Sequence, residues 1–214
     1  MRTRVKMCGF TRSQDIKAAV QAGADALGFV FYQKSKRYVS IAQAAHLRSQ
    51  IPAFVQSVAL FVNASPAFVE QVIQIMKPDL LQFHGEESRA YCESFQHPYI
   101  RAFRVGAPGL ETAEQVLRQC RLYDTAQAWL FDSFSPAYGG SGTQFDLRLL
   151  EQVVAHRTAD DPEMVLAGGV APDRLAQLIT QVHPYAIDVS SAIEDSPGIK
   201  NAAKMQQLMQ ALNF

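Results

Sequence analysis

The sequence predicts an α/β protein whose single domain is a closed (β/α)8 TIM barrel, and three observations lead to this prediction. Eight short apolar runs rich in β-forming residues recur along the 214 residues. Segments with helical periodicity lie between them. Strands that alternate with helices of about ten to fifteen residues indicate a parallel sheet, and eight such units favour a barrel. The runs are VKMC (5–8), ALGFVF (26–31), SVALFV (57–62), LLQFH (80–84), YIRAFRV (99–105), WLFD (129–132), MVLAGG (164–169) and AIDVSS (186–191).

The helical segments are recognised by apolar spacing and by their start signals. After the first run, Ile16, Ala19 and Val20 fall on one helical face. Proline is favoured in a first helical turn, and serine caps free backbone amides. Ser13 and Ser40 are therefore expected to cap helices, and Ser65-Pro66 and Ala171-Pro172 are expected to lie near first helical turns.

The chain length favours one domain, residues 1–214. A barrel of this class takes roughly 200 to over 400 residues, which leaves short loops and no room for a second domain. An open doubly wound sheet is the structural alternative. It would normally carry G-x-G-x-x-G after its first strand, and CGFTRSQD (8–15) lacks that spacing. One long glycine-rich loop, SFSPAYGGSGTQ (133–144), follows the sixth run, and such loops are usually functional or mobile.

Composition and charge argue against several classes of function. Hydrophobic residues make up 48% of the chain and charged residues 19%, values typical of globular proteins. Twenty basic residues balance twenty acidic ones, so nothing favours nucleic acid or an anionic membrane as a partner. No apolar run approaches the roughly 20 residues that cross a bilayer, and the first ten residues lack a signal-peptide pattern. We therefore expect a cytoplasmic protein.

The three cysteines, Cys8, Cys92 and Cys120, form neither a disulfide framework nor a metal-like spacing. No cluster of metal ligands ends the predicted strands, so we expect no metal ion. Cys92 and Cys120 lie in helical segments and are expected to be inert. Cys8 differs, because it ends a strand directly before a glycine.

Polar residues share one face at the carboxyl ends of four predicted strands. In a (β/α)8 barrel the active site lies at these ends, and side chains alternate along each strand. On the first run Lys6 and Cys8 share one face, opposite Val5 and Met7. Each residue alone has a structural explanation, as a cap or as core filling. The recurrence of inward polar residues at the ends of four strands favours an active site. The same inward parity holds for Gln82 and His84, for Asp132, and for Asp188 and Ser190.

Two segments predict a phosphate site. AGGV (167–170) ends the seventh run and DVSSAIEDSPG (188–198) follows the start of the eighth. In such barrels these loops commonly hold a phosphate, and glycine allows the backbone to approach it closely. The alternative is that the glycines only permit a tight turn. We expect a phosphorylated small molecule, held by Gly168, Gly169, Ser190 and Ser191.

Six segments occur in order across nearly the whole chain: KMCGFTR, GADALGFVFYQKSKRYVS, LLQFHGEE, FDSFSPAYGGSGTQFD, LAGGV and AIDVSSAIEDSPGIK. Together they resemble the motifs of the phosphoribosylanthranilate isomerase family of tryptophan biosynthesis. The resemblance implies an Amadori rearrangement without a cofactor, an aldose-to-ketose isomerisation. Its substrate would be N-(5-phosphoribosyl)anthranilate and its product 1-(2-carboxyphenylamino)-1-deoxyribulose 5-phosphate.

The resemblance also implies roles for individual residues. Cys8 would be the general base and Asp132 the general acid. Arg37, in SKRYV, would meet the anthranilate carboxylate, a task suited to a guanidinium fork. Further substrate contacts are expected from Gln82, His84 and Asp188.

A cysteine base raises a problem of ionisation. A free thiol has a pKa of about 8.5, so only a small fraction is thiolate at neutral pH. Lys6 lies one inward position deeper than Cys8, and barrel closure would bring Asp188 beside it. We expect Lys6 to pair with Asp188 and to leave residual positive potential at Cys8.

Two other functions stay open on the sequence alone. One is another sugar-phosphate isomerase or epimerase, although most would use paired carboxylates or a metal. The other is a non-catalytic barrel that binds a phosphorylated metabolite, against which the presence of both Cys8 and Asp132 argues. The sequence does not choose between a monomer and a homodimer.

Overall fold

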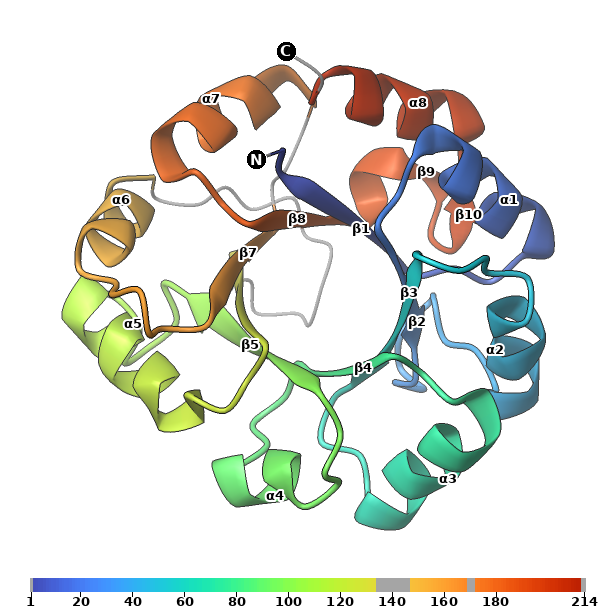
Figure 1. Cartoon of the computed structure of the whole chain (residues 1–214), viewed down its shortest axis with the longest axis horizontal. Coiled ribbons are helices and arrows are strands. Elements are labelled where there is room, and N and C mark those ends of the chain that lie inside the picture. Colours follow the sequence, from blue (N-terminus) through green and yellow to red (C-terminus); the bar gives the residue numbers. More distant parts are fainter. Residues whose placement is uncertain (1, 134–146, 169–171, 213–214) are drawn as a thin grey trace.

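The computed structural model describes residues 2–133, 147–168 and 172–212, and its core is a closed parallel barrel (Figure 1). The strands follow one another around the barrel in sequence order, and β8 pairs with β1. This order confirms the predicted (β/α)8 barrel and excludes the open doubly wound sheet. The strands are β1 (Arg4–Cys8), β2 (Ala26–Val30), β3 (Gln56–Phe61), β4 (Leu80–Phe83), β5 (Tyr99–Val105), β6 (Ala128–Ser133), β7 (Glu163–Ala167) and β8 (Ala186–Val189).

Helices surround the barrel (Figure 1). A short antiparallel pair, β9 (Glu194–Ser196) and β10 (Ile199–Lys200), lies in the connection between β8 and the last helix. Most of the long loop that follows β6, and Gly169, fall outside the described residues. The helices are α1 (Ser13–Ala22), α2 (Ile41–Arg48), α3 (Pro66–Met76), α4 (Arg89–Glu93), α5 (Ala113–Cys120), α6 (Leu147–Ala155), α7 (Pro172–Val182) and α8 (Ala202–Gln210), with 3-10 turns η1 (Arg121–Tyr123) and η2 (Ser191–Ile193).

Most of the predicted helix starts are confirmed. Ser40 caps α2, and Ser65 caps α3, which begins at Pro66. The expectation for Ser13 was wrong, because Ser13 is the first residue of α1 and the cap position is Arg12. There the first turn is stabilised by an ion pair of Arg12 with Asp15, at 2.7 Å, rather than by a hydroxyl cap.

Two apolar layers hold the barrel together. Val5 and Met7 belong to the outer layer, which packs strands against helices. The inner layer fills the barrel with small and branched side chains, which is the usual way such barrels are packed. This division confirms the parity predicted along the strands. One cluster of the inner layer consists of Ile100, Ala102, Ala128, Leu130, Val165, Ala167 and Ala186, and a second consists of Cys8, Val30 and Leu60.

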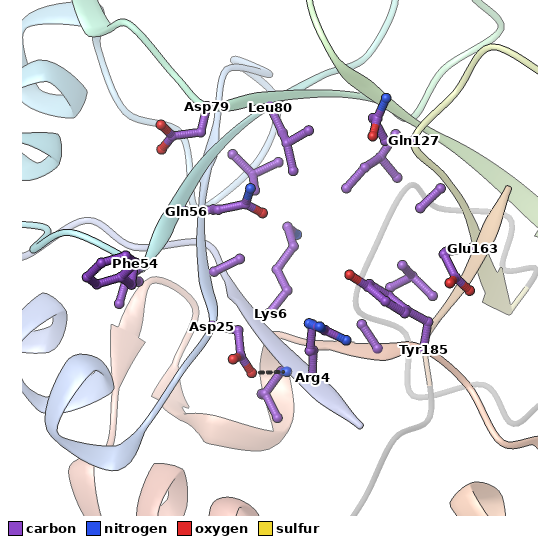
Figure 2. A pocket seen from close by; sticks show the side chains of 18 residues that line it. Arg4, Lys6, Asp25, Phe54, Gln56, Asp79, Leu80, Gln127, Glu163 and Tyr185 are labelled. Carbon is purple, nitrogen blue, oxygen red and sulfur yellow. Dashed lines mark hydrogen bonds between the residues drawn. The ribbon is translucent and has the colours of Figure 1, made fainter. Parts of the chain in front are cut away.

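The amino-terminal mouth of the barrel contains a cavity of about 580 Å³ (Figure 2). Residues at the starts of the strands line it, among them Arg4, Gln56 and Glu163. Figure 2 shows the Lys6 side chain within this ring of residues. Phe54, in the loop before β3, is fully exposed at its edge with a φ of 70°. Lys6 lines this cavity, but none of the residues predicted to react or to bind substrate does, so the candidate site lies elsewhere.

In the described ranges, no helix combines enough length and apolar character to cross a membrane.

Candidate active site

The predicted site residues gather at the carboxyl ends of the strands. Cys8 ends β1, Asp132 is the penultimate residue of β6, and His84 directly follows β4. Gly168 follows β7 and Ser190 follows β8. Because the strands are parallel and the barrel is closed, all these ends face one mouth, opposite the cavity of Figure 2.

Cys8 points into the barrel and packs with Val30 and Leu60. Only 6% of the residue is exposed. Its backbone carbonyl accepts hydrogen bonds from Ser190 Oγ, at 3.0 Å, and from Lys200 Nζ. The end of β1 is thus tied to the segment after β8 and to β10.

A buried ion pair joins β1 to β8 beneath Cys8. Lys6 and Asp188 are register partners in the two strands, and Lys6 Nζ lies 2.7 Å from Asp188 Oδ2. The predicted pairing is confirmed, since barrel closure brings β8 beside β1. Asp188 Oδ1 is buried and has no hydrogen-bond partner among the residues that the structure describes.

The ionisation of Cys8 is decided by competing effects. Burial raises the pKa of the thiol most strongly, because it removes water from the charged form. The ammonium of Lys6 lowers this pKa more than the carboxylate of Asp188 raises it, so the expected residual positive potential is present. Lys200 adds to it. Burial nevertheless prevails, and the pKa of Cys8 lies above its ordinary value.

Asp132 is the end of a hydrogen-bonded chain of three predicted residues. Gln82 Nε2 lies 3.1 Å from His84 Nδ1, and His84 Nε2 lies 3.2 Å from Asp132 Oδ2. An amide nitrogen only donates, so Nδ1 accepts and the ring proton sits on Nε2, directed at Asp132. Gln82 is fully buried, and its Oε1 has no partner among the described residues. Gln82 therefore sets the tautomer of the imidazole that holds Asp132.

Arg37 is bound by a carboxylate of the protein itself. Its Nε and Nη2 donate to Glu194, at 2.9 and 2.7 Å, while Nη1 takes no part in these bonds. Lys200 Nζ lies 2.8 Å from the same carboxylate. A Cβ added to Gly9 would lie 2.5 Å from Arg37 Cδ. The Arg37 side chain therefore packs directly against Gly9, the residue that follows Cys8.

Burial and charge oppose each other at Glu194 as well. Burial would raise the pKa of this carboxyl, but Arg37 and Lys200 outweigh burial and lower the pKa below the ordinary value. For Lys200 burial dominates, and the pKa of its ammonium is lowered. The hydrogen bonds to Glu194 raise the pKa of Arg37. A buried carboxylate thus stays ionised between two cations.

The expected phosphate-binding residues are only partly described. Gly168 has a φ of 72°, a conformation that favours glycine, and a Cβ there would strike Asp132 Oδ1. The Ser190 hydroxyl donates a hydrogen bond to the Cys8 carbonyl, and Ser191 begins the short turn η2. Since β7 and β8 are paired neighbours, Gly168 and Ser190 follow adjacent strands of the mouth. Gly169 lies outside the described residues.

Sequence reasoning missed the charged residues that support the site. Glu194 and Lys200 stood within a quoted motif, but no role was assigned to them. The only signal was an acid and a lysine that flank a Pro-Gly turn, which is weak.

Arg101 and Glu87 were missed as well, and they brace the segment that carries His84. Arg101 donates to the carbonyls of Phe83 and Gly85, at 3.0 and 2.9 Å. Glu87 accepts from the amides of Asn63 and Gly85, at 2.7 and 2.9 Å. The backbone on both sides of His84 is therefore held by buried charges.

Comparison with known proteins identifies the family. The family model described as N-(5'phosphoribosyl)anthranilate (PRA) isomerase matches residues 5–211. The chain belongs to this family. The PRA isomerase of Bordetella pertussis is 55% identical over 99% of this chain and 96% of its own length. The PRA isomerase of Pseudomonas putida is 44% identical over 98% of this chain and 97% of its own length.

Solved PRA isomerases share the fold along the whole chain. The crystal structure of the enzyme from Thermotoga maritima is 34% identical, with a TM-score of 0.87 over 99% of this chain and 98% of that one. A PRA isomerase in complex with reduced 1-(o-carboxyphenylamino)-1-deoxyribulose 5-phosphate is 31% identical, with a TM-score of 0.83 over the same shares. The resemblance inferred from the motifs is thus confirmed.

Proposed function

We propose that this protein is the isomerase that converts N-(5-phosphoribosyl)anthranilate into 1-(2-carboxyphenylamino)-1-deoxyribulose 5-phosphate in tryptophan biosynthesis. The match to the family over residues 5–211 supports the activity. The observation that carries the mechanism is a thiol and a carboxyl group, Cys8 and Asp132, on inward positions of β1 and β6 at one mouth of the barrel.

In the first step Asp132 acts as the general acid. It donates its proton to the furanose ring oxygen, and the C1–O bond breaks as the nitrogen lone pair forms an iminium. His84 donates to Asp132 Oδ2, which leaves Oδ1 as the oxygen that carries the transferred proton. Gln82 keeps the imidazole in the required tautomer.

In the second step Cys8 acts as the general base. Its thiolate removes the proton from C2, and the electron pair moves through C1 to the iminium nitrogen to give an enolamine. The enolamine then gains a proton at C1 and loses one from O2, which yields the ketose. C2 is oxidised as C1 is reduced, so the reaction is an intramolecular oxidation–reduction and balances without a redox cofactor.

The raised pKa of Cys8 has a direct consequence for this step. At neutral pH most molecules hold the neutral thiol, and only the fraction with a thiolate can abstract a proton. Lys6 and Lys200 enlarge this fraction, because both lower the thiol pKa against the effect of burial.

Binding is assigned to groups around these two residues. The phosphate lies at the segments after β7 and β8, with Gly168, Gly169, Ser190 and Ser191. Arg37 meets the anthranilate carboxylate through Nη1, while Glu194 holds the rest of the guanidinium. His84 is close enough to Asp132 to contact the sugar as well. For Gln82 and Asp188 the observed partners are His84 and Lys6, and their direct contact with substrate stays a prediction.

The decisive experiment supplies phosphoribosylanthranilate to the purified protein and follows the loss of its fluorescence. Cys8→Ala and Asp132→Asn are expected to abolish turnover and still to bind the reduced product analogue. A protein that only binds phosphometabolites would show no turnover in the wild type. Turnover that survives both substitutions would instead overturn the assignment of the acid and the base.

The biological role and the assembly need separate tests. The gene is expected to restore growth of a tryptophan auxotroph that lacks this isomerase, and we propose that the enzyme works in the cytoplasm. One solved relative is described as monomers of the dimeric Thermotoga maritima enzyme. Sedimentation equilibrium of the purified protein would decide between monomer and homodimer.

A further inference from the structure

Gly28 occupies a place in the barrel wall where a glycine needs a reason. It lies in the middle of β2 and is the register partner of Cys8. Glycine in the interior of a strand weakens it, because it adds chain entropy and no packing. Its φ is not in the left-handed range, so the backbone there would accept any L-residue. The reason for glycine must therefore be space.

The space beside Gly28 is filled by the sulfur of Cys8. A Cβ placed on Gly28 would lie 2.7 Å from Cys8 Sγ, a separation that side-chain atoms essentially never adopt. The same atom would lie 3.2 Å from both Cα and Cβ of Cys8. Val30 and Leu60 pack against the cysteine as well. The thiol thus rests in a notch that exists because residue 28 has no side chain.

The backbone of Gly28 holds the chain just beyond Cys8. Its carbonyl accepts hydrogen bonds from the amides of Gly9 and Phe10, at 2.9 and 3.1 Å. One residue therefore anchors the end of β1 through its carbonyl and receives the sulfur through its missing side chain. The position of Sγ relative to Lys6 depends on both contacts.

We propose that Gly28 is a positioning residue that directs the thiol of Cys8 and keeps it beside the ammonium of Lys6. The inference rests on the proposed role of Cys8 as the base. Any side chain at position 28 would displace the sulfur from the inner wall, since the backbone of Cys8 is fixed by its pairing with Gly28 and by the hydrogen bonds to its carbonyl. Displacement of Sγ changes both the direction in which the thiolate points and its distance from Lys6.

Asp132 has a related contact, although it does not carry the proposal. A Cβ on Gly168 would strike Asp132 Oδ1 and would lie 2.5 Å from Ser133 Oγ. Gly168 is also required by its φ of 72°, so space and backbone cannot be separated there. At Gly28 only space is at issue, which makes it the residue to test.

The test is Gly28→Ala, with two readouts. The first is steady-state kinetics, in which we expect kcat to fall about 100-fold, as for a reacting group displaced by about 1 Å. KM should change less than about threefold, because the groups assigned to binding are untouched. The second is the pH dependence of alkylation at Cys8, followed by mass spectrometry of its peptide. We expect its midpoint to rise, because the sulfur moves away from Lys6.

The control is Ala128→Val, which adds bulk to an inner position of another strand, β6, where it lines the cavity of Figure 2. It should leave both readouts unchanged. A folded Gly28→Ala protein with wild-type kcat and an unchanged alkylation midpoint would overturn the proposal. If the wild type had no isomerase activity, the proposed function would fail, whereas the alkylation midpoint would still test the notch.

A second variant covers the case in which Gly28→Ala does not fold. The double variant Gly28→Ala/Cys8→Ala lacks the sulfur that the new methyl group meets, so it should fold and should be more stable than Gly28→Ala alone. Misfolding of the double variant to the same extent would show that the methyl group clashes with the backbone instead, and would contradict the notch.

Discussion

At the residue scale, the chemistry depends on how a few buried charges are compensated. Cys8 is a nearly inaccessible thiol whose pKa is raised by burial and partly lowered again by Lys6 and Lys200. Asp132 is held by the His84 imidazole, which a buried amide orients. Each reacting group is therefore governed by a second residue that does not itself react.

The substitution Lys6→Met should raise the thiol pKa of Cys8 further. It removes an attraction to the thiolate and leaves the repulsion by Asp188 unopposed. The alkaline rise in kcat/KM should therefore move to higher pH, which a pH–rate profile measures. The double variant Lys6→Met/Asp188→Asn should return the rise in kcat/KM part of the way to lower pH. A profile that stays unchanged in Lys6→Met would disprove the coupling.

The substitution Gln82→Glu should impair the acid. A carboxylate beside His84 Nδ1 can only accept, so it draws a proton onto Nδ1 and favours an imidazolium between two carboxylates. Asp132 is then held as an anion, and kcat should fall at least about tenfold. Nitrogen chemical shifts of His84 would report the protonation, and Gln127→Glu at the other mouth is the control. An imidazolium with undiminished kcat would refute the role.

At the element scale, the β9–β10 pair closes one side of the site. Glu194 begins β9 and Lys200 ends β10, and their ion pair faces Arg37 from the segment after β2. Lys200 also reaches the carbonyl of Cys8 at the end of β1. Glu194 thus connects the β9–β10 pair to Arg37, and Lys200 connects the same pair to the end of β1, which keeps Arg37 next to the base.

The substitution Glu194→Gln should destabilise the protein strongly. It leaves two buried or half-buried cations without their partner, for which about 3 to 5 kcal/mol is typical. Urea unfolding measures the loss. Asp195→Asn, a change at an exposed neighbour, should cost far less stability than Glu194→Gln. Equal losses in both variants would mean that the ion-pair network contributes nothing specific.

At the scale of the whole molecule, the two mouths of the barrel differ in content. The carboxyl mouth carries Cys8, His84 and Asp132, each held by hydrogen bonds or packing to neighbouring strands. The amino mouth carries a cavity that is lined by none of the residues assigned to catalysis or substrate binding. This separation of reactive groups from the opposite end agrees with the general rule for such barrels.

The stability of the protein should fall in acid. The pKa of Glu194 is lower in the folded state than its ordinary value of 4.5, so the unfolded chain takes up the proton first as the pH falls. The stabilisation from this carboxylate is complete above about pH 4.5 and is lost as the pH drops through the folded-state value. Unfolding by urea between pH 3 and pH 7 should show this loss, and Glu194→Gln should show a shallower dependence. If the stability of the wild type and of Glu194→Gln changed in parallel with pH, this role of Glu194 would be contradicted.

Several parts of the site were predictable because they follow from local pattern. Alternation along a strand placed Lys6 and Cys8 inward, and barrel closure paired Lys6 with Asp188, as observed. The ionisation of Cys8 was not predictable in the same way. It depends on burial by Val30 and Leu60, which come from other strands.

The bond between Arg37 and Glu194 lies across 157 positions of the chain, and no local rule relates them. The contact of Gly28 with the sulfur of Cys8 likewise depends on the register of β1 with β2.

The amino-acid sequence alone determined the alternation of strands and helices, the barrel class and the set of inward polar residues, because periodicity is a property of consecutive residues. Only the tertiary structure decided which charges pair, which groups are desolvated and where the sulfur rests. Those properties are sums over atoms that barrel closure brings together, and their magnitudes depend on distances that no sequence pattern contains.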